Sequence, residues 1–308
     1  MPRHTVFPRR ILPEAMSVTP WLADDGWSLR SFSLPAQAPL PKGNILFLGG
    51  RADFFEKYLE PVQTWSAAGW QVSGFDWRGQ GGSGQTHADG CCHMPDFGLF
   101  LSDLEGFAAQ WMERSSGPHV VIGHSMGAHV VLRAVAERRI QPDGIILSSP
   151  MLGIRAGPLG QRTIGLAGQL GRVPMLSSKP VWGKKTPTPR QHITTCPDRH
   201  ADKLWWKAKQ PELARGGPTW GWLAGAVASL EACERQLRRR PMVLPCMMLC
   251  ARSDLVVDNR AINRLAACLP RLSRHEIFGA GHELLRERDR PRGEAMALIA
   301  RFCEEIRS

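Results

Sequence analysis

A short segment in the middle of the chain, Gly-His-Ser-Met-Gly at residues 123–127, constrains the fold more than any other feature. The apolar run 119–122 before it predicts a buried strand, and residues 128–138 after it predict a helix. A strand that turns into a helix through Gly-x-Ser-x-Gly is a nucleophile elbow. The turn is so tight that Ser125 takes a strained conformation, and side chains at Gly123 and Gly127 would collide with neighbouring backbone. The strain holds the serine hydroxyl at the carboxyl end of the strand, where the helix N-terminus favours negative charge.

Partners for this serine follow two other predicted strands. A serine hydroxyl is a good nucleophile only when a base takes its proton, and the base needs an acid to hold its tautomer. Asp254 follows the apolar strand predicted at 245–252, and His282 lies in the loop after the strand predicted at 274–278. Because the carboxyl ends of parallel strands meet at one sheet edge, we expect Asp254 and His282 to meet Ser125 there.

Structural interpretations of the same residues stay open. Asp254 could be a turn residue or a helix cap, and Asp258 competes for the acid role, although it fits better as the N-cap of a helix predicted at 259–265. A lone histidine is usually structural, but His282 follows a Gly-x-Gly turn at the right distance after a strand, which favours catalysis. His124, inside the elbow, is expected to pack beside the nucleophile.

Three further motifs accompany the elbow. They are Gly-Gly-Arg-Ala-Asp-Phe-Phe-Glu-Lys-Tyr at 49–58, Asp-Trp-Arg-Gly-Gln-Gly-Gly-Ser at 76–83 and His-Glu-Leu-Leu-Arg-Glu at 282–287. With these motifs the chain resembles the α/β-hydrolase superfamily, and within it the branch of lysophospholipases and monoacylglycerol lipases that is also catalogued with serine aminopeptidases. The resemblance spans about residues 20–150 and 240–305. It implies an α/β-hydrolase fold, in which helices flank a mostly parallel central sheet and a lid is inserted.

The resemblance also indicates an oxyanion hole. Amides aimed at the carbonyl oxygen stabilise the charge that develops there, each by about 3 kcal/mol. One is the backbone amide of Met126, the residue after the nucleophile, and matching positions to the family points to the backbone amide of Arg51 for the other. The chain departs from monoacylglycerol lipases here, because it reads Gly49-Gly50 where they usually read His-Gly.

Two other motifs are interpreted as decoys. The segment 79–84 satisfies Gly-x-Gly-x-x-Gly, but loop residues follow it where a dinucleotide site needs a helix. Two histidines and two cysteines lie close together in sequence, but their spacing fits no standard zinc site; they are His87, Cys91, Cys92 and His93. The sequence therefore predicts neither a cofactor nor a metal.

Composition sets the class of protein and its expected location. A chain of 308 residues, 43% hydrophobic and 22% charged, can bury a large core. The first residues contain no apolar core of a signal peptide, and no run approaches the ~18 apolar residues of a membrane span. Eight cysteines in so long a chain are interpreted as reduced core residues. We expect a cytoplasmic protein, with peripheral membrane contact as a further hypothesis.

The alternation of strands and helices divides the chain. It runs from an edge strand predicted at 27–34 to Pro150, which favours a parallel sheet covered by helices. Residues 151–240 are rich in Gly, Pro, Met and Trp and have weak periodicity, and the sheet pattern resumes afterwards. We therefore predict a hydrolase core at 1–150 and 241–308, with residues 151–240 inserted above the active site as a lid.

The lid region is strongly basic. Residues 151–245 hold 16 Lys and Arg against 5 Asp and Glu, whereas the rest of the chain holds 23 of each sign, so the whole net charge of +11 lies there. Five of the eleven tryptophans lie there too. Tryptophan beside basic residues suits an anionic lipid surface, so we predict that the lid docks on such a surface and receives a lipid with a phosphate headgroup. The alternative is an ordinary solvated basic face with the tryptophans in the lid's own core. Without a recognisable nucleic-acid module, nucleic acid is not an expected partner.

The predicted reaction is hydrolysis of a small lipid ester through an acyl-enzyme, by a lysophospholipase or a monoacylglycerol lipase. His282, oriented by Asp254, takes the proton of Ser125, which attacks the ester carbonyl, and water activated by the same histidine then frees the fatty acid. Three alternatives remain: a serine aminopeptidase, an acyltransferase, and a non-catalytic binding protein on the same scaffold. The surplus of Lys and Arg in the lid argues against the aminopeptidase, which needs carboxylates to hold an amino group.

Overall fold

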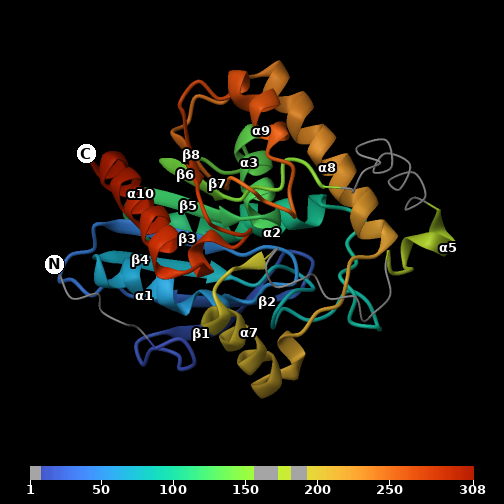
Figure 1. Ribbon diagram of the computed structural model, residues 1–308, viewed down its shortest axis with the longest axis horizontal. Coiled ribbons are helices and arrows are strands. Elements are labelled where there is room, and N and C mark those ends of the chain that lie inside the picture. Colours follow the sequence, from blue (N-terminus) through green and yellow to red (C-terminus); the bar gives the residue numbers. More distant parts are fainter. Residues whose placement is uncertain (1–7, 156–172, 182–192) are drawn as a thin grey trace.

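A single sheet of eight strands forms the centre of the computed structural model, which describes residues 8–155, 173–181 and 193–308 (Figure 1). The strand order is β1-β2-β4-β3-β5-β6-β7-β8. Strands β3 to β8 pair in parallel, and the β1–β2 hairpin joins them antiparallel through β4. The strands are β1 Ser17–Leu22, β2 Ser28–Leu34, β3 Gly43–Leu48, β4 Trp70–Phe75, β5 His119–His124, β6 Gly144–Ser148, β7 Cys246–Ala251 and β8 Leu272–Ile277. This arrangement confirms the predicted fold class.

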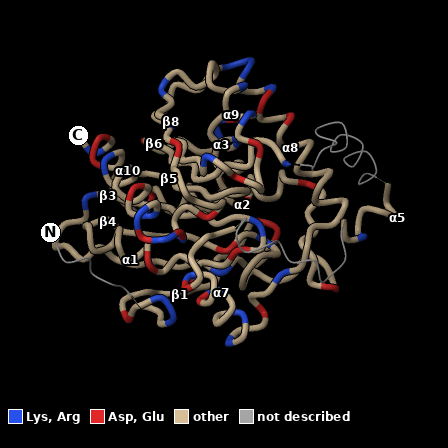
Figure 2. The backbone as a smooth tube through the Cα atoms, in the orientation of Figure 1, with Lys and Arg blue, Asp and Glu red and all other residues tan. Residues whose placement is uncertain are grey.

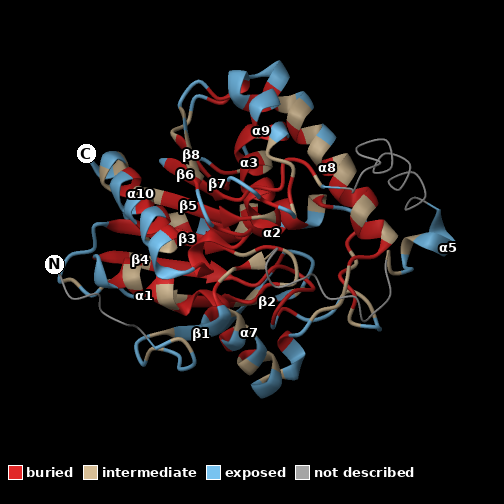
Figure 3. Cartoon of the chain, viewed as in Figure 1, coloured by how far each residue is buried: buried red, intermediate tan, exposed pale blue. Residues whose placement is uncertain are grey.

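Helices cover both faces of the sheet, so its central strands are buried throughout (Figure 3). One apolar core joins the sheet to α2, α3, α8 and α9, and a second core joins the other face to α1 and α10. Their bounds are α1 Leu59–Ala67, α2 Gly98–Glu113, α3 Met126–Ala136, α8 Trp220–Arg239, α9 Arg260–Leu265 and α10 Asp289–Arg307. Short 3₁₀ turns complete the described chain: η1 Phe55–Tyr58, η2 Pro211–Leu213, η3 Ala266–Cys268 and η4 Leu284–Arg286.

The predicted edge strand is not the edge. Residues 28–34 form β2, and β1 lies outside it. β1 was not predicted because its residues are almost all exposed, so they show no alternation of apolar and polar positions. Pro20 fits there because an edge strand has backbone amides without a ladder partner.

The chain between β6 and β7 forms the predicted lid region. Its described helices are α5 Pro174–Ser177, α7 Pro197–Lys209 and α8; α5 packs against the start of α8, whereas α7 lies apart from both (Figure 1). Lid residues 156–172 and 182–192, with Trp182, lie outside the described residues. The domain boundaries at 150 and 240 stay predictions.

Within the described ranges, no helix has both the length and the apolar character to span a bilayer.

Candidate active site

The segment 123–127 forms the sharp turn between β5 and α3. Ser125 has φ 53° and ψ −116°, a conformation that side-chain-bearing residues rarely adopt. A Cβ on Gly123 would lie 2.6 Å from the Cα of Ala128, and one on Gly127 would lie 2.3 Å from the carbonyl oxygen of Gly49. Both positions therefore require glycine, for the reason given by the sequence.

Ser125, His282 and Asp254 lie in one hydrogen-bonded row. His282 Nε2 is 2.8 Å from Ser125 Oγ, and His282 Nδ1 is 2.8 Å from Asp254 Oδ2. His282 and Asp254 are buried, whereas Ser125 is partly exposed. Burial acts to raise the pKa of Asp254, but the hydrogen bond and charge of His282 outweigh it, so the pKa is lowered and the carboxylate stays ionised.

Asp254 is also a turn residue, so its two interpretations are compatible. Its Oδ1 accepts the amides of Val256 and Val257 at 2.7 and 3.0 Å, while Oδ2 faces the histidine. Asp258 points elsewhere: its Oδ1 accepts the Arg260 amide at 3.0 Å, at the start of α9.

The loop after β3 passes directly beside the serine. A Cβ on Gly50 would lie 3.0 Å from the Cβ of Ser125. Two amides of this loop are already engaged: Gly50 N donates to Asp53 Oδ2 at 2.8 Å, and Ala52 N donates to Gln80 Oε1 at 2.7 Å.

The amides expected to form the oxyanion hole lie next to those engaged groups. Among the hydrogen bonds of the described residues, none uses the amide of Arg51 or of Met126. The Arg51 side chain lies apart from its amide, with its guanidinium 3.5 Å from the Gly216 carbonyl and over the ring of Trp222. Assignment of these two amides to an oxyanion hole stays a proposal.

Comparison with known proteins decides the family. The sequence model of the serine aminopeptidase S33 family matches residues 39–289. This chain belongs to that family of α/β-hydrolases. It is 27% identical over 274 residues to a probable lysophospholipase L2 of Haemophilus influenzae, with 84% of this chain and 82% of the relative covered. It is also 27% identical over 290 residues to lysophospholipase L2 of Escherichia coli K12, with 84% and 79% covered.

Solved structures share the fold. A soluble variant of monoglyceride lipase from Saccharomyces cerevisiae matches with a TM-score of 0.75 at 15% identity, over 97% of this chain and 99% of that one. A monoacylglycerol lipase from Paleococcus ferrophilus matches with a TM-score of 0.72 at 18% identity, over 90% and 99%. The protein is an α/β-hydrolase, an enzyme of the carboxylic ester hydrolase type.

A buried charge cluster lies beneath the active site of this hydrolase. Lys57 Nζ bridges Asp53 Oδ1 and Glu283 Oε1, the latter at 2.7 Å. Tyr58 donates its hydroxyl to Asp53 Oδ2 at 2.8 Å, and Arg286 pairs with Glu283. All five side chains are buried. The cluster therefore joins the loop beside Ser125 to the loop that carries His282.

The charges of this cluster balance. Burial acts to raise the pKa of Asp53 and of Glu283, but Lys57 outweighs it and holds the pKa of Asp53 at about 2 and that of Glu283 well below its usual range. His124 packs against the cluster with its ring centroid 5.0 Å from that of His282, and burial lowers its pKa to about 4. His124 is therefore neutral at pH 7.

The sequence indicates these cluster residues only as parts of two family motifs, without a role for any of them. Asp53, Lys57 and Tyr58 belong to the motif at 49–58, and Glu283 and Arg286 to the motif at 282–287. The pairing of Lys57 with Glu283 crosses more than two hundred positions of sequence, so no local pattern could predict it.

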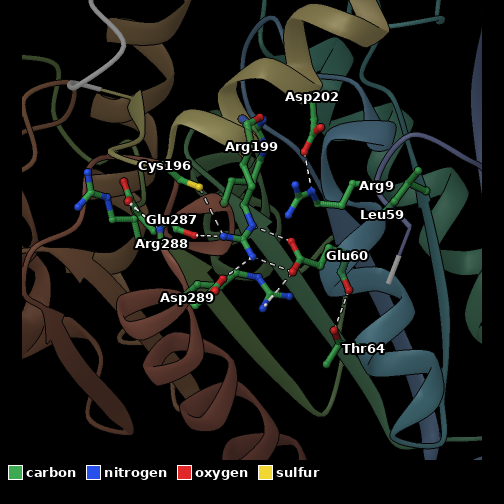
Figure 4. A network of polar contacts seen from close by, with 12 residues as sticks. Arg9, Leu59, Glu60, Thr64, Cys196, Arg199, Asp202, Glu287, Arg288 and Asp289 are labelled. Atoms are coloured by element: carbon green, nitrogen blue, oxygen red, sulfur yellow. Dashed lines mark hydrogen bonds and ion pairs between the residues drawn. The ribbon is translucent and has the colours of Figure 1, made fainter. Parts of the chain in front are cut away.

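Helix α7, in the predicted lid region, is held to the core by ion pairs (Figure 4). The Arg199 guanidinium donates to both carboxylate oxygens of Glu60 on α1 at 2.7 Å. It also donates to Oδ1 of Asp289 on α10 at 2.8 Å. Asp202, one turn on, pairs with Arg9 at 2.6 Å. Arg199 and Asp202 are both buried, so α7 docks through a face that combines these charged side chains with the ring of Trp206.

The residues before α7 bind the histidine loop. The Ile193 carbonyl accepts the Glu283 amide at 2.8 Å, and Thr195 donates its amide and hydroxyl to the Glu287 carboxylate at 2.7 and 2.6 Å. The Glu287 carboxylate also accepts the amide of Gly281. The segment before α7 is therefore hydrogen-bonded to Glu283 directly, and to the residue before His282 through Glu287.

Helix α8 docks through an apolar face instead. Trp222 packs edge-on against Phe97, with centroids 5.7 Å apart, and belongs to the main core. Ser229 is the polar exception: its hydroxyl lies 2.7 Å from His129 Nε2 and accepts from Arg133 at 2.9 Å.

The tryptophans of the lid face inward more than the membrane hypothesis anticipates. Trp206 and Trp222 are buried, and Trp205 and Trp220 are partly buried. Trp206 packs with residues of the core rather than within the lid alone, since its cluster includes Phe54 and Leu59. Two of the described tryptophans are thereby unavailable to a lipid surface.

No group of histidine, cysteine, aspartate and glutamate in the described part of the chain is arranged to hold a metal ion.

Proposed function

We propose that this enzyme hydrolyses the acyl ester of lysophospholipids by a Ser-His-Asp acyl-enzyme mechanism. The observation that carries the proposal is His282, hydrogen-bonded at 2.8 Å to Ser125 on one side and to Asp254 on the other. With Asp254 holding Nδ1–H, Nε2 is the free base that can take the Ser125 proton.

In the first step Ser125 Oγ attacks the ester carbonyl and its proton moves to His282 Nε2. Negative charge on the former carbonyl oxygen is stabilised by the amides of Arg51 and Met126. The alcohol then leaves as the acyl C–O bond breaks, protonated by His282. In the second step water gives its proton to His282, attacks the acyl-enzyme and releases the fatty acid while Ser125 recovers its proton.

The substrate class is supported by the relatives and by charge. The two bacterial relatives that align over most of their length are lysophospholipases by name. The basic residues between β6 and β7 suit a phosphate-bearing substrate better than an uncharged monoacylglycerol. Contact with an anionic membrane stays part of the proposal, since the described part of the chain between β6 and β7 carries many Lys and Arg residues (Figure 2).

The test is fatty-acid release from a lysophospholipid and from a monoacylglycerol of the same acyl chain. Purified enzyme should turn over both, with the larger kcat/KM for the lysophospholipid, and Ser125→Ala should turn over neither. An aminoacyl anilide serves as a third substrate, and its cleavage in place of the esters would replace this proposal with the peptidase alternative.

A further inference from the structure

One face of α7 carries two lysines on the side that packs against η1. Lys203 and Lys207 lie one helical turn apart and are partly buried. They share the inward side of the helix with buried Arg199 and Trp206, whereas Lys209 is exposed.

Both lysines interact electrostatically with the buried cluster across the interface between α7 and η1. Lys203 interacts with Lys57, Glu283 and Arg286, and Lys207 interacts with Lys57 and Glu283. No hydrogen bond or ion pair joins either lysine to a residue within the described ranges.

The nearby carboxylates are already engaged. Both oxygens of Asp53 and both oxygens of Glu283 accept from other groups, chiefly Lys57, Tyr58 and Arg286. The interface therefore holds two more basic groups than the local carboxylates pair with. Burial lowers the pKa of Lys203 to about 7 and lowers the pKa of Lys207 below its usual value, so both charges are costly without an anion.

The segments at the two ends of α7 contact the loops that carry the reacting groups. Residues before α7 are hydrogen-bonded to the His282 loop. Trp206 and Leu213, at and after its other end, pack on Phe54, just past the loop beside Ser125. The helix thus runs from the histidine loop to the serine loop. In a lysophospholipid the phosphate belongs to the leaving alcohol, a few bonds from the oxygen that His282 protonates.

We propose that Lys203 and Lys207 form a subsite for the headgroup phosphate of a lysophospholipid. This inference rests on the proposed function for the identity of the lipid. Two ammonium groups on one helical face can each donate to a phosphate oxygen, and such charge-assisted hydrogen bonds are about twice as strong as neutral ones. A phosphate placed there balances the surplus charge that the protein itself leaves unpaired.

The experiment measures equilibrium binding, so that it does not depend on turnover. Full-length Ser125→Ala is titrated with two non-hydrolysable ethers of the same chain, a 1-O-alkyl glycerophosphoglycerol and a 1-O-alkyl glycerol, each below its micelle concentration. The ratio of their dissociation constants reports the phosphate contribution. We expect the phospholipid ether to bind more tightly, and Lys203→Met/Lys207→Met in the same background to reduce that preference by about tenfold or more.

Lys209→Met is the matched control, since it removes a lysine from the exposed side of the same helix and should leave the ratio unchanged. An unchanged ratio in the double variant would overturn the subsite. So would equal weakening of both ethers, because the lysines would then only support the lid. Displacement of the ether by inorganic phosphate at least as effectively as by glycerol 3-phosphate would identify a free-anion site and also overturn it.

The proposed function fails separately. If the active enzyme releases no fatty acid from any lipid ester while the binding ratio behaves as expected, the subsite stands and the hydrolysis proposal falls.

Discussion

Both η1 and α7 place a lysine at the contact between them, but within the described part of the chain one lysine is ion-paired and the other is not. On the core side, Lys57 is buried and bridges the carboxylates of Asp53 and Glu283. On the lid side, Lys203 faces that cluster without an ion pair among the described residues, and burial lowers its pKa to about 7. A buried charge needs a partner. The ion-paired Lys57 therefore stabilises the fold, whereas Lys203, unpaired within the described ranges, lowers the free energy of unfolding.

This difference separates structure from recognition at one interface. A protein tolerates an unfavourable group where function requires it, and substrate-binding sites collect such groups. The balanced cluster joins the loops of the proposed catalytic residues, and the unbalanced lysines lie where a substrate anion would complete them. The comparison predicts that lysine substitutions a short distance apart have opposite effects on stability.

The largest expected effect is the loss of activity on removing a proposed catalytic residue, and it gives the reference against which the lysine variants are compared. Ser125→Ala and His282→Ala should each lower kcat for ester hydrolysis by about 10⁴-fold or more, because each removes a member of a unit that works together. Both variants should stay folded, and Ser125→Ala should keep the wild-type thermal midpoint because Ser125 is partly exposed, whereas His282→Ala also leaves buried Asp254 without its partner. Turnover within tenfold of wild type in either purified variant would remove the acyl-enzyme mechanism itself.

Removing the balanced lysine should destabilise the fold. Lys57→Met leaves Asp53 and Glu283 without their shared cation, and breaking a buried pair in this way costs about 3–5 kcal/mol. Urea denaturation measures the change in the free energy of unfolding. Because Asp53 also holds the Gly50 amide, the loop beside Ser125 should loosen and kcat should fall.

The control for that change is Lys42→Met. Lys42 pairs with Glu304 at 2.7 Å, but both side chains are about 40% exposed (42% and 39%). Exposed pairs contribute about 1 kcal/mol or less, so this variant should be nearly neutral. Equal losses in the two variants would mean that burial of the Lys57 cluster has no special weight.

Much of this arrangement could be predicted from sequence, and the reason is local. Ser125, Asp254 and His282 each lie in the turn or loop after a predicted strand, and parallel strands bring such loops to one edge. The balanced cluster was not predictable, because Lys57 and Glu283 come from opposite ends of the chain. The docking of α7 was not predictable either, since Arg199 and Asp202 are charged residues that the structure buries.

The lid tryptophans show a different limit. A basic, tryptophan-rich stretch suggests a lipid surface, but composition does not tell whether an aromatic ring faces lipid or core. Trp206 and Trp222 complete the core. The basic residues of the same stretch also differ in their surroundings. Arg199 forms ion pairs with core carboxylates, whereas Lys203 forms none among the described residues.

Removing the unbalanced lysine should stabilise the fold slightly. Lys203→Met keeps the apolar stem and deletes a charge that burial disfavours, so we expect a gain of about 1 kcal/mol at pH 6. The pKa of Lys203 is near 7 in the folded state and near 10.5 unfolded, so the unfolded chain binds more protons between these values. The wild-type penalty is therefore complete below pH 7 and fades as pH rises, and the gain should shrink with it. Destabilisation at pH 6 comparable to that of Lys57→Met would erase the distinction between the two lysines.

The smallest effect is the pH dependence of headgroup preference. Lys203 loses its charge as pH rises through its folded pKa of about 7, with Lys57, Lys207, Arg286 and Glu283 as the charged groups that face it. A bound phosphodiester favours the protonated lysine, so the decline should begin somewhat above pH 7 and amount to a few-fold in the ratio of the two ether dissociation constants by pH 9. A phosphodiester ligand keeps its own charge constant over this range. The same titration on Lys203→Met should be flatter; an equally steep decline there would assign the pH dependence to another group and leave Lys207 alone as the phosphate contact.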